Sequence, residues 1–234
     1  MKAIVKIFIC IFLLLFTITL HSQLSQIKGL NPTGLSQNDA GDGIKEALSK
    51  GTRESIKIVS IKDGYFGNVE IKIPFPEHAK EMESKLRSIG LGSKVDEVVL
   101  SMNRAAEDAA KDAEQIFIDA IKKMTINDAL KIVHGENDAA TKYLKKTTST
   151  DLTIKFRPII KASLDKVNAT KLWSELITEY NKIPLVKKQN PNLTEYVTKK
   201  AIEGLFIMIA KKELEIRQNP TEQGSELLKK VFGK

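Results

Sequence analysis

The sequence predicts an all-α protein: a single bundle of roughly eight helices, with a short extended segment near residues 69–76. After Pro76, apolar residues recur at steps of three and four, which is the spacing of a helix that buries one face. Helix-starting signals precede several of these stripes, for example Asn192 with Glu195. The chain has no internal repeat of fixed period, so we expect one helical domain over residues 43–234.

Residues 1–23 have the layout of a secretory signal peptide. Lys2 and Lys6 form a basic start, an apolar run of about 14 residues follows, and the chain turns polar at His21. A membrane span needs roughly 20 apolar residues, so this run is too short to span comfortably. We therefore expect an exported protein, in which residues 24–42, rich in glycine and asparagine, form a flexible tether.

Composition narrows the classes of partner and cofactor. The full chain has a net charge of +8, of which the signal carries two. In an exported protein we expect no nucleic acid as partner; the lysines either keep the surface soluble or meet an anionic partner, such as lipid headgroups, envelope polymer or an acidic protein. The only cysteine, Cys10, lies in the signal. His78 and His134 have no paired-ligand spacing, so we expect no metal and no cofactor.

The first half of the domain leaves one element open. Helical spacing begins near Ile44, but residues 52–62 fit a strand and a helix equally well. Residues 69–76 should be extended, because Pro74 and Pro76 restrict the residues before them. Pro76 then suits the first turn of a helix that runs to about Ile89.

The next stripes are more regular. Ser93 with Asp96 predicts the start of a helix rich in alanine, whose apolar stripe continues to Met124. Thr125 with Asp128 predicts the start of a short helix that ends at Gly135, and a further helix begins near residue 139.

Later breaks depend on single residues. Ser149, Thr150 and Asp151 predict a fresh helix start, and Pro158 predicts a kink or a restart. Asn168 opens another helix. The segment 193–217 is apolar all round in its middle, so we expect it at the centre of the core, and a last amphipathic helix should follow over 221–233.

Several strings in this chain resemble one bacterial family. In order they are Asp63-Gly64-Tyr65-Phe66-Gly67-Asn68, Ile73-Pro74-Phe75-Pro76, Leu100-Ser101-Met102-Asn103-Arg104-Ala105-Ala106-Glu107, Met124-Thr125-Ile126-Asn127-Asp128-Ala129, Lys155-Phe156-Arg157-Pro158, Tyr196-Val197-Thr198 and Leu227-Leu228-Lys229-Lys230-Val231-Phe232-Gly233. Their order and spacing are similar to those of domain of unknown function 4197, over about residues 44–233.

The resemblance implies a mostly helical protein that is exported or lipid-anchored in Gram-negative bacteria, which makes the periplasm the expected location. It also favours a helix over residues 52–62. It brings no activity, cofactor or catalytic residue to this chain. The lipid-anchored form needs a cysteine at the end of the signal, and this chain has none there.

Two groups of residues are candidates for a site. Asn103, Arg104 and Glu107 interrupt an alanine-rich stripe, and Arg104 and Glu107 are three residues apart on one helix face. They form either a polar network that fixes helix register or a cluster that faces a ligand. Candidate partners on other helices are Arg157, Glu203 and Glu213.

Tyr65 and Phe66 form the second group. Two aromatic residues in a glycine-flanked loop either contact a partner or membrane, or fold back over the core, and the sequence supports both interpretations equally.

The molecular function is not evident from these residues. The leading hypothesis is a non-enzymatic periplasmic binding or scaffold protein of the cell envelope, since the chain is exported, mostly helical and without a recognisable catalytic set. One alternative is a carrier that holds an apolar or lipid-like ligand near Ala105–Ala109. Another is a cryptic hydrolase that uses His134 or the pair Arg104 and Glu107.

Overall fold

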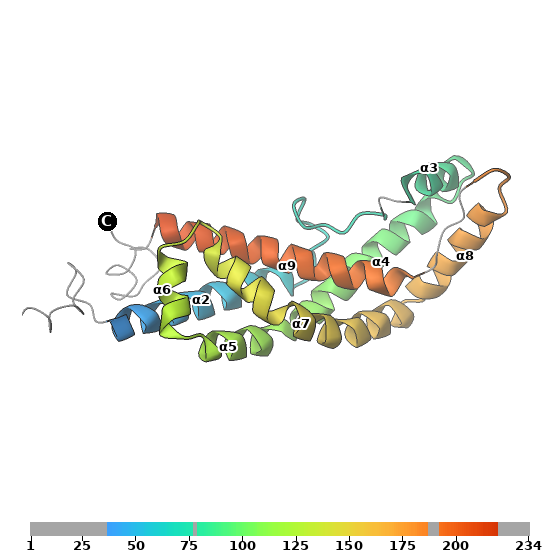
Figure 1. Cartoon of the computed structure of the whole chain (residues 1–234). Coiled ribbons are helices and arrows are strands. Elements are labelled where there is room, and N and C mark those ends of the chain that lie inside the picture. Colours follow the sequence, from blue (N-terminus) through green and yellow to red (C-terminus); the bar gives the residue numbers. More distant parts are fainter. Residues whose placement is uncertain (1–36, 77–78, 187–191, 220–234) are drawn as a thin grey trace, which may run out of the picture.

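The computed structural model describes residues 37–76, 79–186 and 192–219. Within these ranges the regular secondary structure is helical throughout, which confirms the all-α prediction (Figure 1). The helices are α2 (Gln37–Val59), α3 (Lys80–Ser88), α4 (Gly92–Ala110), α5 (Ala113–Lys123), α6 (Ile126–Val133), α7 (Ala139–Lys166), α8 (Ala169–Asn181) and α9 (Leu193–Gln218).

Helix α9 lies at the centre of the bundle, as the sequence predicted. It packs against α2, α4, α7 and α8, and Figure 1 shows it running lengthwise along the molecule. Val197 and Leu205 are fully buried, and the Phe206 ring meets the Phe117 ring of α5 edge-on, with centroids 5.8 Å apart. The core is therefore organised around one helix that is apolar on several sides.

Helix α2 begins earlier than the sequence suggested. It starts at Gln37, so residues 37–42 of the expected tether are helical. Gly41 is buried and close to Ile126, whose side chain would lie 3.6 Å from a Cβ at position 41. The lack of a side chain at Gly41 lets the two helices approach closely. The glycine content of this segment had suggested flexibility instead.

The ambiguous segment 52–62 is helical as far as Val59. A loop of residues 60–76 then crosses to α3, and we call it the docked loop. Its middle is a turn and not extended as predicted, because the backbone N–H groups of Ile71 and Lys72 both donate to the carbonyl oxygen of Asn68, at 3.2 and 2.8 Å.

The turn at Gly90 was predicted correctly, but the helix starts on either side of it were not. Gly90 has a φ of 86°, a conformation that favours glycine. Helix α3 begins at Lys80 and not at Pro76. Helix α4 begins at Gly92 without a side-chain cap, so Ser93 lies within its first turn, and the Asp96 carboxylate accepts a hydrogen bond from Arg87 of α3 at 2.7 Å.

The cap that starts α6 was predicted correctly. The backbone N–H of Asp128 donates to Thr125 Oγ1 at 3.1 Å, and that of Thr125 donates to Asp128 Oδ2 at 3.2 Å. The Thr125 hydroxyl also donates to Asp128 Oδ2 at 2.6 Å. That bond, and then the bond from the Thr125 backbone, lowers the pKa of the Asp128 carboxyl. The stripe before this cap is divided into α4 and α5.

Helix α7 continues where a new helix was expected. The Ser149 hydroxyl donates to the carbonyl oxygen of Lys145 at 2.5 Å, so it bonds back into the helix instead of capping a new one. Pro158 lies inside the same continuous helix. The prediction of a restart is therefore wrong, and burial of Leu152 and Phe156 against the core explains the continuity.

Helix α9 starts as predicted, since the backbone N–H of Glu195 donates to Asn192 Oδ1 at 3.1 Å. The residues 1–23 expected as signal and the last amphipathic helix expected over 221–233 lie outside the described residues.

Candidate functional site

The candidate residues Asn103, Arg104 and Glu107 of α4 lie beneath the docked loop. Asn103 is fully buried and Glu107 is 4 % exposed. All three side chains bond to the loop, and we call them the loop anchor. The structure brings them together as the sequence predicted, because they share one face of a helix.

Glu107 binds the backbone of the loop. Its Oε1 accepts hydrogen bonds from the backbone N–H groups of Tyr65 and Phe66, at 3.1 and 3.2 Å. Its Oε2 accepts a bond from Arg104 Nη1 at 2.7 Å. Both oxygens are thus engaged by donors of the protein itself, which makes this carboxylate a poor candidate for accepting a proton from a substrate.

Arg104 joins Glu107 to the loop. Its Nη2 donates to Asp63 Oδ1 at 2.7 Å, so the guanidinium bridges two carboxylates. The hydrogen bond to Glu107 is the main cause that raises the pKa of Arg104, and the bond to Asp63 adds to it. Asp63 is 41 residues away in the chain, and the sequence analysis did not identify it as a partner.

Asn103 holds the next part of the loop. Its Oδ1 accepts from the backbone N–H of Ile73 at 2.8 Å, and its Nδ2 donates to the carbonyl oxygen of Ile73 at 2.8 Å. A third bond joins Nδ2 to the carbonyl oxygen of Val99, also at 2.8 Å. The amide therefore pairs with both backbone groups of Ile73. It satisfies the N–H and the carbonyl oxygen that a neighbouring strand would otherwise bind.

Tyr65 folds back into the core. It is fully buried, and its hydroxyl donates to the carbonyl oxygen of Ala201 at 2.6 Å. Burial, and then the charge of Glu107, raises the pKa of this phenol. Gly204 leaves room for the ring, because a Cβ there would lie 2.7 Å from Tyr65 Cε1. Of the two interpretations left open, the structure supports the lid over the core for Tyr65.

Phe66 is half-buried and lies beneath two cations. Lys72 Nζ is 4.1 Å from the ring centroid and Arg104 Cζ is 5.8 Å from it. Both distances are within the range of a cation–π contact. Further along, the Phe75 ring packs edge-on against Trp173 of α8, with centroids 5.1 Å apart. The docked loop is thus held at both ends.

The predicted partners of the loop anchor are elsewhere. Arg157 pairs with Glu195 at 2.9 Å on an exposed surface. Glu203 pairs with Lys200 at 3.3 Å. Glu213 is also used elsewhere, so none of the three long-range partners named from the sequence reaches Arg104. The spacing of residues predicts neighbours on one helix, but it does not predict which residue of another helix or loop they contact.

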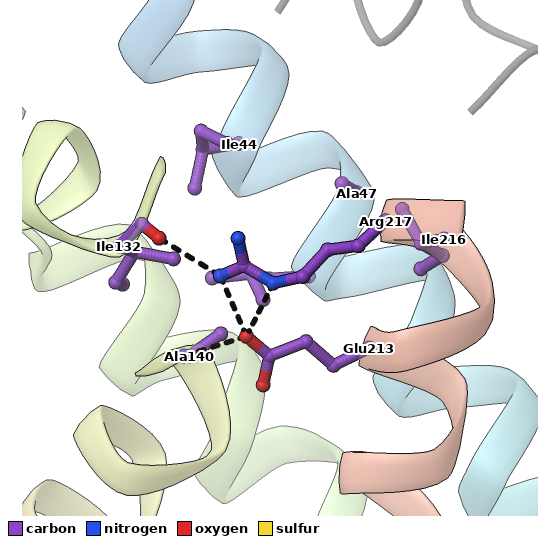
Figure 2. A pocket seen from close by; sticks show the side chains of 8 residues that line it. Ile44, Ala47, Ile132, Ala140, Glu213, Ile216 and Arg217 are labelled. Carbon is purple, nitrogen blue, oxygen red and sulfur yellow. Dashed lines mark hydrogen bonds and ion pairs between the residues drawn. The ribbon is translucent and has the colours of Figure 1, made fainter. Parts of the chain in front are cut away.

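Glu213 belongs to a second buried polar group that the sequence analysis missed (Figure 2). Its carboxylate accepts hydrogen bonds from the backbone N–H groups of Ala140 and Thr141, at 2.9 and 2.8 Å, and therefore caps the start of α7. Arg217 bonds to Glu213 at 2.8 Å and to the carbonyl oxygen of Ile132, near the end of α6, at 2.8 Å. We call Glu213 and Arg217 the helix-end pair.

The charges of the helix-end pair suit the helix ends that they meet. A carboxylate lies at the positive end of α7 and a guanidinium at the negative end of α6. Ile44, Ile132 and Ile216 line a cavity of about 20 Å³ beside the pair (Figure 2). That volume corresponds to about one water molecule.

The described residues contain no group of three or more His, Cys, Asp or Glu side chains that is able to hold a metal ion. His134 follows the last residue of α6, where its backbone N–H donates to the carbonyl oxygen of Leu130 at 3.2 Å. His78 lies outside the described residues. Among the helices of the described part, none is long and apolar enough to cross a membrane.

One family of proteins matches most of the chain. The family model described as Protein of unknown function (DUF4197) matches residues 34–233. The chain belongs to this family. The match begins before α2 and includes the docked loop, the loop anchor and the helix-end pair. Comparisons with curated proteins and with solved structures gave no match.

Proposed function

We propose that this DUF4197 domain is a non-enzymatic binding or scaffold protein of the bacterial periplasm. One observation supports this most: the hydrogen bonds of Asn103, Arg104 and Glu107 go to the docked loop, to one another and, for Asn103, to the backbone of α4. The polar cluster therefore orders a surface segment and does not present free groups to a substrate. A rigid, pre-ordered segment favours binding because less conformational entropy is lost on association.

The location in the periplasm is part of the same proposal. Its support is the signal-like layout of residues 1–23, with a basic start and a short apolar run. Removing that segment would leave a chain in which no cysteine remains, as suits a protein that folds without disulfides.

The two alternative functions have less support. A carrier of an apolar ligand needs an interior cavity, but Ala105, Ala106 and Ala109 are fully buried in the packed face of α4. The cavity beside the helix-end pair is far smaller than the roughly 300 Å³ of a small-molecule site. A hollow of about 320 Å³ between α6 and α7 reaches that volume, but charged side chains such as Asp128, Lys131 and Glu136 line it, which does not suit an apolar ligand. A hydrolase needs an accessible base, and Glu107 is already bonded on both oxygens.

Affinity purification of the tagged full chain from cross-linked envelopes tests the proposal. We expect an envelope component that is recovered with the wild type and depleted with Arg104→Ala, which releases the docked loop. Arg157→Ala is the matched control, because it removes an exposed arginine that pairs with Glu195 outside this site. Recovery that does not differ between the two variants would contradict the proposal.

An activity screen completes this test. Wild type and Glu107→Ala are assayed with ester, phosphoester and glycoside substrates, and we expect equal background rates. Turnover by the wild type that disappears in Glu107→Ala would replace the binding function with a hydrolase.

A further inference from the structure

We propose that the face around the docked loop binds the surface of membranes that contain anionic phospholipid. This inference rests on the proposed binding function and names its partner. We call this face the loop-side surface. It consists of four exposed aliphatic residues and three lysines: Ile58, Ile61, Val69, Ile207, Lys57, Lys62 and Lys72.

Contacts to α9 place the elements that carry this surface beside one another. The Ser55 hydroxyl, near the end of α2, lies 3.3 Å from the carbonyl oxygen of Met208. Asn68 of the docked loop lies 3.5 Å from the sulfur of the same Met208. Glu70 forms an ion pair with Lys211. The end of α2, the middle of the loop and one turn of α9 therefore meet, and Figure 1 shows the loop beside α9.

The aliphatic residues of this surface are exposed to solvent. The exposed fractions are 93 % for Val69, 59 % for Ile61, 48 % for Ile58 and 43 % for Ile207. Val69 follows the segment that Glu107 holds and precedes Ile73, which Asn103 holds. The loop anchor thus fixes the backbone on both sides of Val69, the most exposed aliphatic residue of this surface, so that insertion into a membrane surface needs no prior ordering of the loop.

The charge of the surface is positive. Three nearby carboxylates are each paired with a cation: Asp63 with Arg104, Glu70 with Lys211 and Glu54 with Lys212. Within the described part of the chain, Lys57 and Lys62 form no ion pair with a carboxylate. Lys72 lies over the ring of Phe66, and its charge adds to the Arg87 hydrogen bond that lowers the pKa of the Asp96 carboxyl. The surface therefore combines exposed aliphatic side chains with three lysines.

This combination suits a lipid surface better than a protein. Protein interfaces are depleted in lysine, and their energetic centres are rich in tryptophan, tyrosine and arginine. On the loop-side surface the open residues are isoleucine, valine and lysine, whereas Tyr65 is buried. Aliphatic insertion together with lysines that attract anionic headgroups is the usual basis of peripheral membrane binding.

Flotation of the full chain with vesicles tests the lysines. The vesicles contain phosphatidylglycerol with phosphatidylcholine, or phosphatidylcholine alone. We expect tighter binding to the anionic vesicles, and a loss of about tenfold or more in Lys57→Glu/Lys62→Glu. The control is Lys94→Glu/Lys171→Glu, which changes the net charge equally on exposed lysines of α4 and α8. We expect the control to lose less than about twofold.

A second pair of variants tests the aliphatic contact. Val69→Asp should weaken binding to anionic vesicles by roughly tenfold, whereas Ile154→Asp, on an aliphatic residue of α7 that is 68 % exposed, should leave it within about twofold. Equal thermal unfolding of all variants, followed by circular dichroism, separates lost binding from lost folding. The apolar run at the start of the chain is common to every sample and cancels in these ratios.

Equal binding of the loop-side and control variants, or equal binding to both kinds of vesicle, would overturn the membrane proposal. An acidic protein whose capture depends on Lys57 and Lys62, without vesicle binding, would overturn it too but would leave the binding function in place. Loss of the binding function itself is seen separately, as failure of the Arg104→Ala comparison.

Discussion

The docked loop and the junction of α6 with α7 are each held by one buried glutamate, and the two differ in what the glutamate holds. Glu107 and Glu213 each accept two consecutive backbone N–H groups and pair with an arginine on their own helix. Glu107 holds an irregular loop against one helix. Glu213 joins α9 to the start of α7 while its arginine reaches the end of α6.

Exposure separates the two arginines as well. The Arg217 side chain is 11 % exposed, whereas that of Arg104 is 31 % exposed and bonds outward to Asp63. The same chemistry therefore serves the packing of the core at one site and the order of a surface segment at the other. We expect damage at the helix-end pair to lower global stability and damage at the loop anchor to act mainly on the loop.

Removing the buried carboxylate of the helix-end pair should have the largest effect. Glu213→Ala leaves the N–H groups of Ala140 and Thr141 without their acceptor and Arg217 without its carboxylate. We expect a loss of about 3–5 kcal/mol in the free energy of unfolding, measured with urea. Glu179→Ala, which breaks the exposed pair with Lys182, is the control and should cost less than about 1 kcal/mol.

Glu107→Gln should cost less and act locally. The side chain keeps its shape but loses the negative charge that binds Arg104 and two backbone N–H groups. We expect a loss of about 2 kcal/mol in the free energy of unfolding. We expect faster hydrogen exchange at Tyr65 and Phe66, with the exchange at Thr141 unchanged. Equal acceleration at all three amides would contradict the distinction between the two regions.

Gly204→Ala should disturb the docked loop from the α9 side. The added Cβ would lie 2.7 Å from the ring of Tyr65, which is fully buried and bonded to Ala201. We expect a loss of about 1–2 kcal/mol in urea unfolding, because the ring has no space into which it moves. Gly92→Ala is the control, since its nearest neighbour there is the side chain of Arg87 at 3.6 Å.

The smallest effect should be on how the free energy of unfolding depends on pH. Burial raises the pKa of Tyr65 above its ordinary value of 10.0, so above that pH the unfolded state releases the proton first. The stability that this phenol contributes is complete below pH 10 and is lost as the pH rises further. Tyr65→Phe should cost about 1 kcal/mol at pH 7 through the lost bond to Ala201.

The same variant should flatten the decline of stability above pH 10, as followed by urea unfolding at several pH values. Tyr143→Phe is the comparison. Tyr143 is only half-buried, and burial, then the charge of Asp128, raises the pKa of its phenol. An equal alkaline slope in wild type and Tyr65→Phe would show that the phenol does not contribute.

Local signals in the sequence predicted local structure well. The caps at Thr125 and Asn192 formed as expected, because each bond joins residues three apart and needs no distant partner. The same kind of signal failed at Ser149, whose hydroxyl bonds back into a continuous helix, and at Ser93, because α4 already begins at Gly92. The competition between a cap and a continuing helix depends on neighbours that the local sequence does not name.

The sequence indicated which polar residues share one face of α4, but not which segment they hold. Arg104 and Glu107 were found because they interrupt an apolar stripe on one helix face. Their partner Asp63 and the backbone of Tyr65 lie about 40 residues away, at a distance that only the folded chain closes. Glu213 was assigned to the wrong partner for the same reason.

Helix periodicity and capping act over a few residues, so they were enough to predict the helical class, the central place of α9 and several helix ends. The donors of each buried carboxylate depend instead on how the folded helices pack. A buried charge must be neutralised by the groups that packing brings to it. For Glu107 and Glu213 these include backbone N–H groups, which every residue type except proline has and which the sequence therefore does not distinguish.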